Sequence, residues 1–387
     1  MNEFDFIRRV REQTRTRRHS SRLVTGIGDD ASVVNQLANR DLIITTDLLI
    51  ERIDFYRDAA PAAVLGHKAL AVSLSDIAAM GGRPFWSLLS IGMPAETWRD
   101  NFKDEFFSGY FALADKYGVT LAGGDVSRTR EGIVIDSIVL GEVTSGAAVL
   151  RSGARPGDQI YVTGTLGGAA AGLKLIEMGA RLSVSGIASL PRASKRGGPN
   201  VSEGGAEGGS SPTLREGSGS EPGAVATGSL AADTQRSETK AIETLLLRQL
   251  RPSPRVGWGI VLGEESLAAS MIDISDGLSS DLTHLCEESH VGALIDSAAL
   301  PIDKDVIHLC GRRALDPLML ALHGGEDFEL LFTVHPDNVA RLPKRVDGVA
   351  ISRIGEVTDQ PGKIRIAEKN RVWDLRPEGF EHFKTDP

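Results

Sequence analysis

Apolar and polar positions along the chain follow two periods, and segments with each period alternate. Short runs rich in Val, Ile and Leu predict β-strands at residues 41–46, 86–91, 119–122, 133–143, 159–163, 270–274, 292–295, 329–334 and 350–356. Longer segments with apolar residues three and four positions apart predict helices at residues 61–80, 95–117, 168–178, 238–250, 278–288 and 316–323. This alternation predicts an α/β or α+β protein.

The length of 387 residues suggests two domains, because a domain commonly holds about 150 residues. A polar, turn-rich segment at residues 151–158 separates the first group of strands from the next and predicts a boundary. We therefore expect one domain at residues 1–150 and a second at 151–387. Residues 182–236 are rich in Gly, Ser and Pro and have few large apolar side chains, which predicts a disordered insertion in the second domain.

The composition excludes several classes of partner. With 43 basic and 52 acidic residues the net charge is −9, which favours neither a nucleic acid nor a membrane as partner. The N-terminal residues do not resemble a secretory signal, and no stretch approaches the roughly 18 apolar residues that span a bilayer. Two cysteines, Cys286 and Cys310, are too few for a disulfide framework. We expect a cytoplasmic protein.

Acidic residues recur beside glycine at the ends of predicted apolar elements. Any one of them is explained by turn or capping chemistry. Asp76 is different, because it lies inside a predicted helix too apolar to face solvent. A buried carboxylate needs a compensating charge, and few lysines or arginines lie beside these motifs, so a divalent cation is the expected partner. The recurring acids are Asp29, Asp30, Asp47, Asp76, Asp125, Asp273, Asp276, Glu326 and Asp327.

The chemistry of these side chains favours magnesium. Carboxylates and threonine hydroxyls without nearby cysteine or paired histidine suit a hard cation rather than zinc. Magnesium commonly accompanies a phosphorylated ligand, and so many acids beside a nucleotide require several ions. The P-loop, dinucleotide-binding and protein-kinase motifs are missing, which excludes the common phosphoryl-transfer folds. The sequence TGTLGG at 163–168 indicates only a tight turn between a strand and a helix.

Ordered strings over nearly the whole chain, apart from residues 182–236, resemble those of the thiamine-monophosphate kinase family. This family belongs to the superfamily that includes aminoimidazole ribonucleotide synthetase and selenophosphate synthetase. The strings are GIGDD at 26–30, TTD at 45–47, KALAVSLSDIAAMG at 68–81, GGD at 123–125, RSGARPGD at 151–158, RPSPR at 251–255, DISDGL at 273–278, GGEDFEL at 324–330 and GFEHF at 379–383.

The resemblance implies a two-domain, synthetase-like fold. Its N-terminal domain, with a mixed sheet, would bind ATP and magnesium and pair across a homodimer; its C-terminal domain would be α/β. The implied reaction is ATP-dependent phosphorylation of thiamine monophosphate to thiamine diphosphate by direct in-line transfer of the γ-phosphoryl group. We expect no essential general base, because the acceptor is a phosphate oxygen already largely deprotonated near neutral pH. Arg151 would stabilise the developing charge.

The resemblance also assigns roles to individual residues. The implied magnesium ligands are Asp30, Thr45, Thr46, Asp47, Asp76, Asp125, Asp273 and Asp276. The implied ATP contacts are Gly124, Asp125, Arg151 and Ser275. The implied substrate contacts are Asp54, Glu326 and Phe380. The chain departs from the family at Asp54, where histidine is common and where a carboxylate would repel the substrate phosphate.

Two other functions are compatible with these residues. Another enzyme of the superfamily could use ATP with a different acceptor, but the strings at 273–278 and 324–330 favour the thiamine branch. A scaffold that binds nucleotide or assists metallocentre maturation, without catalysis, could also keep this fold. Retention of the metal-type acids counts against the scaffold, because carboxylates without a role would destabilise the core through mutual repulsion.

Overall fold

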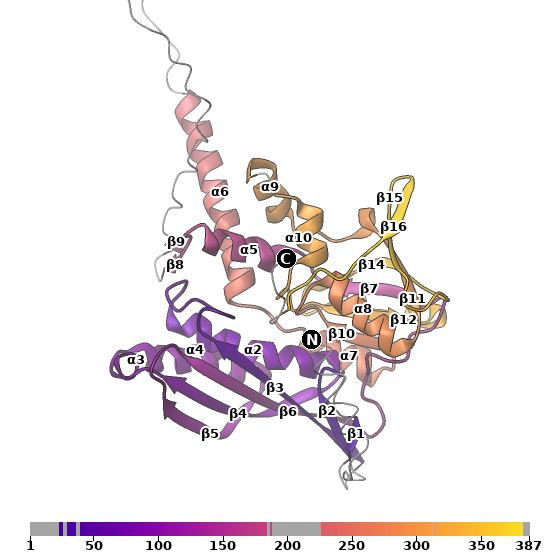
Figure 1. Ribbon diagram of the computed structural model, residues 1–387, viewed down its shortest axis with the longest axis horizontal. Coiled ribbons are helices and arrows are strands. Elements are labelled where there is room, and N and C mark those ends of the chain that lie inside the picture. Colours follow the sequence, from indigo (N-terminus) through magenta and orange to yellow (C-terminus); the bar gives the residue numbers. More distant parts are fainter. Residues whose placement is uncertain are drawn as a thin grey trace, which may run out of the picture.

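Two mixed β-sheets with helices packed on them make up the protein (Figure 1). The structure is a computed structural model that describes residues 23–25, 29–35, 39–183, 186–187, 226–313 and 315–381. The first sheet has the order β1-β2-β3-β6-β4-β5, with β4 and β5 parallel and every other pair antiparallel. Its strands are β1 (Leu23–Thr25), β2 (Ser32–Asn35), β3 (Arg40–Ile50), β4 (Arg83–Met93), β5 (Thr120–Arg128) and β6 (Val134–Thr144).

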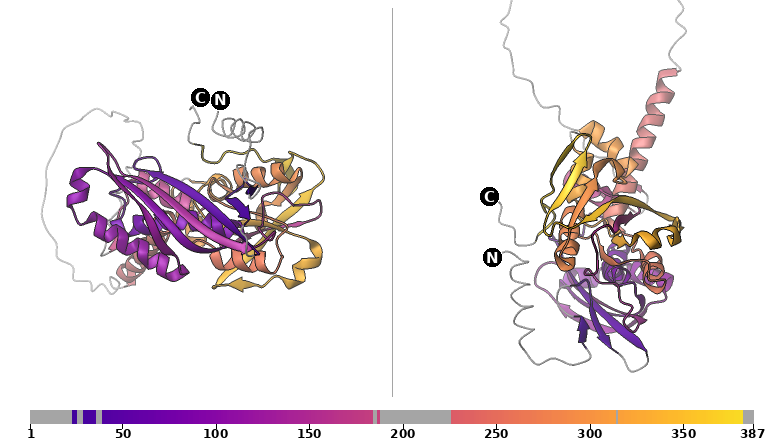
Figure 2. Two further views of the ribbon diagram at one scale, coloured as in Figure 1. Left: turned by 90° about the horizontal axis from the view of Figure 1, so that it is seen from below. Right: turned by 90° about the vertical axis from the view of Figure 1, so that its right-hand side faces the viewer.

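Helices cover one face of the first sheet and leave the other open among the described residues. Helices α2 (Ala62–Ala79) and α4 (Phe102–Tyr117) lie on the inner face, whereas the opposite face is seen bare from below (Figure 2, left). The single helix predicted at residues 95–117 is wrong in one respect. It is two helices, α3 (Ala95–Arg99) and α4, because Asp100 takes an extended backbone with ψ of 173°.

The second sheet has eight strands in the order β10-β12-β7-β14-β11-β15-β16, with β13 beside β14. All its pairs are antiparallel except β11 with β15. The strands are β7 (Gln159–Thr163), β10 (Ser270–Asp273), β11 (Gly292–Asp296), β12 (Leu330–Val334), β13 (Arg345–Val346), β14 (Val349–Thr358), β15 (Ile364–Glu368) and β16 (Arg371–Asp374). The helices are α5 (Gly168–Glu177), α6 (Ala226–Leu250), α7 (Val256–Glu264), α8 (Leu278–Ser289), α9 (Lys304–Arg313) and α10 (Pro317–His323), with short 3-10 turns η1 (Ser297–Ala299) and η2 (Pro336–Arg341).

The α/β prediction is confirmed, and each predicted strand is present. The elements of the two sheets and their helices that were missed are β1, β2, β13, β15, β16, α7 and α9, together with the turns η1 and η2. Helix α7 was missed because the run from Val256 to Glu264 is apolar on all sides and shows no clear helical stripe. Tight turns join β7 to α5 as expected, with Gly164 and Gly167 at φ of +57° and +82°.

The structure describes secondary structure at both ends of the predicted insertion at residues 182–236. A small hairpin, β8 (Leu182–Ser183) with β9 (Gly186–Ile187), lies at its start. Helix α6 begins at Ala226 rather than at residue 238, and its first part projects away from the body (Figure 1). Adding residues to an existing helix costs less free energy than nucleating a new one. The later turns of α6, which pack on α5, therefore stabilise its projecting first part. Residues 184–185 and 188–225 lie outside the described residues.

Helix α2 connects the two halves of the molecule. It contacts β3 and β6 of the first sheet, β10 of the second, and helices α4 and α7. One hydrophobic cluster accordingly includes Ile43 and Leu74 together with Met271 and Phe332. Among the described residues α2 is the one helix long and apolar enough to cross a membrane, and most of it is buried inside the protein. Its composition is thus explained by its central position.

We expect the contact between α2 and α4 to tolerate no Cβ at two glycines. A Cβ at Gly66 would lie 1.9 Å from the Phe106 carbonyl oxygen, and one at Gly109 would lie 1.7 Å from that of Ala63. Either Gly→Ala change should lower the free energy of unfolding by about 1–3 kcal/mol, because the backbones must separate. In contrast, Gly311→Ala in α9 meets nothing within 4 Å and should be neutral or slightly stabilising. Chemical denaturation measures all three; equal effects would contradict the packing.

Candidate active site

Three acids from distant parts of the sequence meet beside α2. One carboxylate oxygen each of Asp30, Asp76 and Asp273 lies within 4.8 Å of the other two. Asp30 precedes β2, Asp76 belongs to the last turns of α2, and Asp273 ends β10. Two ionised carboxylates at this separation repel by about 3 kcal/mol at an effective dielectric of about 20. The expected convergence of these acids is present, and we call these three residues the acidic cluster.

Burial raises the pKa of Asp76 and Asp273 in the cluster and of Asp29 beside it. Burial and then Asp30 raise the pKa of Asp273 to about 8, and burial with Asp47 and Asp273 raises that of Asp76 well above its usual value. The pKa of Asp29 rises to about 7, through burial and the charge of Asp30. The protein alone therefore favours the protonated forms of Asp76 and Asp273, and a cation would favour the ionised forms.

Hydroxyl groups hold these carboxylates in place. Ser75 donates a hydrogen bond of 2.6 Å to Asp273, and Thr45 donates one to Asp76. Ser73 donates one of 2.7 Å to Asp47, whose pKa is raised to about 6, mainly by burial. Each hydroxyl satisfies one oxygen of an acid without neutralising its charge.

Arg151 supplies a cation to the acidic cluster. Its guanidinium binds Asp30 through two hydrogen bonds, of 2.9 and 3.1 Å, and the Asp30 side chain is only 1% exposed. Its own pKa is raised, because the attraction of Asp30 and Asp29 outweighs burial. One guanidinium cannot neutralise three carboxylates when all are ionised. Carboxylate and hydroxyl oxygens that lack a balancing cation fit the donor set that Mg²⁺ prefers.

The other predicted metal ligands lie outside the acidic cluster. Along β3 the side chains alternate, so Thr45 and Asp47 are on the side of α2 whereas Thr46 is exposed. Thr46 donates a hydrogen bond of 2.6 Å to Asp136 on β6, an acid that the sequence motifs did not point to. Asp125, with Gly124, is exposed on β5, the edge strand of the sheet.

A cavity of about 650 Å³ opens between the two halves. All three predicted substrate contacts, Asp54, Glu326 and Phe380, line it. So do three of the predicted metal or ATP contacts, namely Asp47, Ser275 and Asp276. The structure thus brings these residues to one cleft although they are spread from β3 to the end of the described chain.

Backbone hydrogen bonds fasten the walls of this cleft. The N–H of Glu326 donates to the Ser275 carbonyl at 2.7 Å, and the N–H of Phe380 donates to the Asp276 carbonyl at 3.0 Å. The consecutive residues Ser275 and Asp276 therefore fix two of the three predicted substrate contacts, Glu326 and Phe380. Asp54 has a local role, since its carboxylate accepts a hydrogen bond of 2.7 Å from the Ile50 N–H.

Lys68 is a cleft residue that sequence reasoning missed as a site residue. Its side chain is 2% exposed, and its Nζ lies 2.6 Å from Glu326 Oε1. The signal was available, because Lys68 is a charge in the same apolar helix that singled out Asp76. Glu326, which is expected to bind a cationic substrate, thus already forms an ion pair with a cationic side chain.

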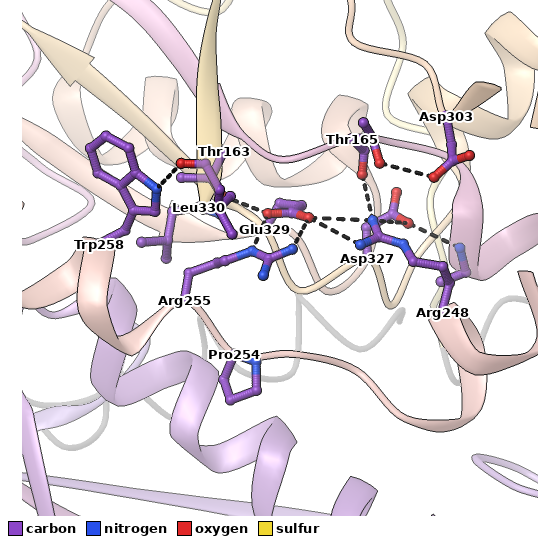
Figure 3. Close-up of polar contacts among 12 residues, drawn as sticks. Thr163, Thr165, Arg248, Pro254, Arg255, Trp258, Asp303, Asp327, Glu329 and Leu330 are labelled. Carbon is purple, nitrogen blue, oxygen red and sulfur yellow. Dashed lines mark hydrogen bonds and ion pairs between the residues drawn. The ribbon is translucent and has the colours of Figure 1, made fainter. Parts of the chain in front are cut away.

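Behind the cleft, Asp327 and Glu329 anchor the loop that carries Glu326. Asp327 accepts hydrogen bonds from Gly167 and Ala169 at the start of α5. Figure 3 shows Glu329 paired with both Arg248 and Arg255. Although burial raises the pKa of Glu329, these two arginines hold it below its usual value. These acids have structural roles, unlike their neighbour Glu326.

Comparison with known proteins agrees with the fold and the cleft. Residues 28–143 match the family model described as AIR synthase related protein, N-terminal domain, and residues 218–367 match the corresponding C-terminal domain. The chain is thus a two-domain protein of the AIR synthase related class. Within this class, a thiamine-monophosphate kinase of Escherichia coli O157:H7 is 36% identical over 99% of this chain and 98% of its own length. The chain belongs to the thiamine-monophosphate kinase family and is a kinase.

Solved structures support the same assignment. One described as AaThiL complexed with AMPPCP and TMP superposes with a TM-score of 0.72 at 28% identity, covering 99% of this chain and 97% of that one. A thiamine-monophosphate kinase from Stenotrophomonas maltophilia K279a gives 0.65 at 32% identity, covering 95% and 98%. The resemblance seen in the sequence strings is confirmed, as is the predicted fold class.

We expect the metal-free protein to lose stability as the pH rises from about 4 to about 8. In this window the Asp273 carboxyl ionises in the unfolded chain, with a usual value of 3.8, but keeps its proton in the folded one, where the pKa is about 8. Unfolding then releases protons, so higher pH favours it. The midpoint of thermal unfolding, followed in EDTA, should fall across this range and be restored by MgCl₂. In Asp273→Asn both the fall of the midpoint with pH and its recovery with MgCl₂ should be smaller, whereas the exposed Asp359→Asn should behave as the wild type. A wild-type midpoint that does not change with pH would contradict the buried acidic cluster.

Proposed function

We propose that this chain transfers the γ-phosphoryl group of ATP to thiamine monophosphate and so forms thiamine diphosphate. The observation that carries the proposal is the cleft itself. Asp54, Glu326 and Phe380 line it together with Asp47, Ser275 and Asp276, in a member of the thiamine-monophosphate kinase family. The cavity of about 650 Å³ is of the size that small-molecule sites commonly have.

We assign the individual roles from the family motifs. The acidic cluster and the cleft support those of Asp30, Asp76 and Asp273 and of the residues that line the cleft, whereas Thr46, Gly124 and Asp125 are assigned from the motifs alone. Mg²⁺ would neutralise the charges of the phosphates and of the acids that hold it, so that these acids need not be protonated. Glu326 and Phe380 would bind the thiamine portion of the substrate. The proposed magnesium ligands are Asp30, Thr45, Thr46, Asp47, Asp76, Asp125, Asp273 and Asp276; the proposed ATP contacts are Gly124, Asp125, Arg151 and Ser275; Asp54 is the third substrate contact.

The protein's part in the reaction is to position the two phosphates and to stabilise charge. A loose transition state spreads negative charge over oxygens and needs alignment more than covalent help. Arg151 is held rigidly by Asp30 and would oppose the charge that develops. The substrate phosphate is its own nucleophile, so no side chain needs to remove a proton from it.

Asp76→Asn and Asp47→Asn should each reduce turnover by about a hundredfold or more and shift its dependence on Mg²⁺, because each removes a proposed ligand charge. The assay contains ATP, MgCl₂ and thiamine monophosphate and scores thiamine diphosphate, with free thiamine as control acceptor. Asp359→Asn is the matched control, since this exposed acid lies at a turn after β14. Wild-type turnover in both variants would refute the metal assignment. Phosphorylation of free thiamine alone would indicate another branch of the superfamily.

We also propose that the chain forms a homodimer through the bare face of the first sheet. Large apolar side chains are exposed on its strands, among them Leu48, Trp86 and Val126, each more than half exposed. An apolar surface of this kind is typical of an interface between subunits.

We further propose that the domain boundary lies between residues 150 and 151. We also propose that the protein is cytoplasmic, where the free thiols of Cys286 and Cys310 would stay reduced.

The wild type should sediment at micromolar concentration with twice the chain mass of 41.3 kDa. Trp86→Glu on β4 should shift it toward the monomer, because burying the new charge opposes association. Trp373→Glu is the matched control: this tryptophan is 39% exposed on β16 of the second sheet, and the change should leave the dimer intact. A monomeric wild type, or loss of the dimer only in the control, would contradict the proposed interface.

A further inference from the structure

Lys68 connects two predicted substrate contacts that belong to different halves of the molecule. Its ammonium lies 2.6 Å from Glu326 Oε1 and donates to the main-chain carbonyl of Asp54 at 3.3 Å. Glu326 comes from the loop before β12 of the second sheet, and Asp54 from the turn after β3 of the first. The Lys68 side chain is 2% exposed and that of Glu326 is 28% exposed, so the ammonium is buried while the carboxylate still reaches the cleft.

The Glu326 carboxylate is held from both sides. Lys68 binds Oε1, and the buried Gln249 on α6 donates to Oε2. The backbone of Glu326 has φ of +65°, a left-handed conformation that is uncommon for a residue with a Cβ and that aims the side chain. The residue that precedes Gln249 on α6 is Arg248, which is fixed by Glu329 (Figure 3). The orientation of the carboxylate is therefore set before any ligand enters.

Helix α2 also relates this ion pair to the acidic cluster. Lys68 and Asp76 are eight residues apart on one rigid helix, which corresponds to a rise of about 12 Å. Glu326 is thereby placed at a fixed distance from the acids that are proposed to hold the phosphates. A ligand that spans this distance must carry a phosphate at one end and a group that a carboxylate can bind at the other.

We propose that Lys68 is a positioning residue for substrate recognition: it holds the Glu326 carboxylate so that this group binds the cationic, amino-bearing thiamine portion of the substrate. This inference rests on the proposed function. Lys68 acts through Glu326 and not by binding the substrate phosphate. Its loss should therefore weaken recognition of thiamine monophosphate while the handling of ATP is kept.

The test is a double-mutant cycle on steady-state kinetics with Lys68→Met, Glu326→Gln and the double variant. Lys68→Met should raise KM for thiamine monophosphate about tenfold or more, with KM for ATP nearly unchanged. The double variant should recognise thiamine monophosphate about as well as Glu326→Gln alone, because the carboxylate that Lys68 positions is absent from both. Lys68→Arg should restore part of the affinity, and the exposed Lys344→Met should match the wild type.

The outcomes separate the inference from the proposed function. An unchanged KM for thiamine monophosphate in Lys68→Met, or fully additive effects in the cycle, would overturn the inference and leave the activity standing. Additivity in particular would indicate that Lys68 binds the substrate directly. A wild type that forms no thiamine diphosphate would overturn both. If Lys68→Met does not fold, the double variant, which removes both charges, is used instead. Its KM for thiamine monophosphate, compared with that of Glu326→Gln, then tests the inference.

Discussion

The molecule is organised around the gathering of carboxylates beside α2. Asp30, Asp76 and Asp273 come together where one guanidinium, that of Arg151, opposes them. Burial and repulsion between neighbouring acids disfavour the ionised forms of Asp76 and Asp273, so the cluster costs folding free energy unless a cation is bound. The protein tolerates this cost because the helix that carries Asp76 is packed into a hydrophobic core shared by both sheets.

Helix α2 serves both the core and the cleft. Its glycine at position 66 allows α4 to approach closely, and its apolar side chains fill the space between the sheets. Lys68 and Asp76 are the charged exceptions, and each meets an acid from the second half of the chain. Because one rigid element carries both charges, the place where a substrate would be bound and the place where phosphates would be held cannot move independently.

The cleft depends on backbone contacts as much as on side chains. Glu326 and Phe380 are fastened to the adjacent carbonyls of Ser275 and Asp276, while Asp327 caps α5 on the far side of the loop. In the string GGEDFEL, therefore, one acid faces the cleft and its neighbour holds the scaffold. The neighbouring acids Glu326 and Asp327 have separate roles because consecutive side chains of the loop point to different surroundings.

Features that depend on local pattern could be predicted from the amino-acid sequence. Alternation of apolar runs predicted the strands, and a carboxylate in an otherwise apolar helix was enough to single out Asp76. The sequence could not show that the helix at 95–117 breaks at Asp100 or that Lys68 meets Glu326. The last of these contacts joins residues on different elements, and only the packing of the two sheets around α2 decides which of many charged side chains become neighbours. Charge pairing over such separations in sequence leaves no local periodicity from which it could be predicted.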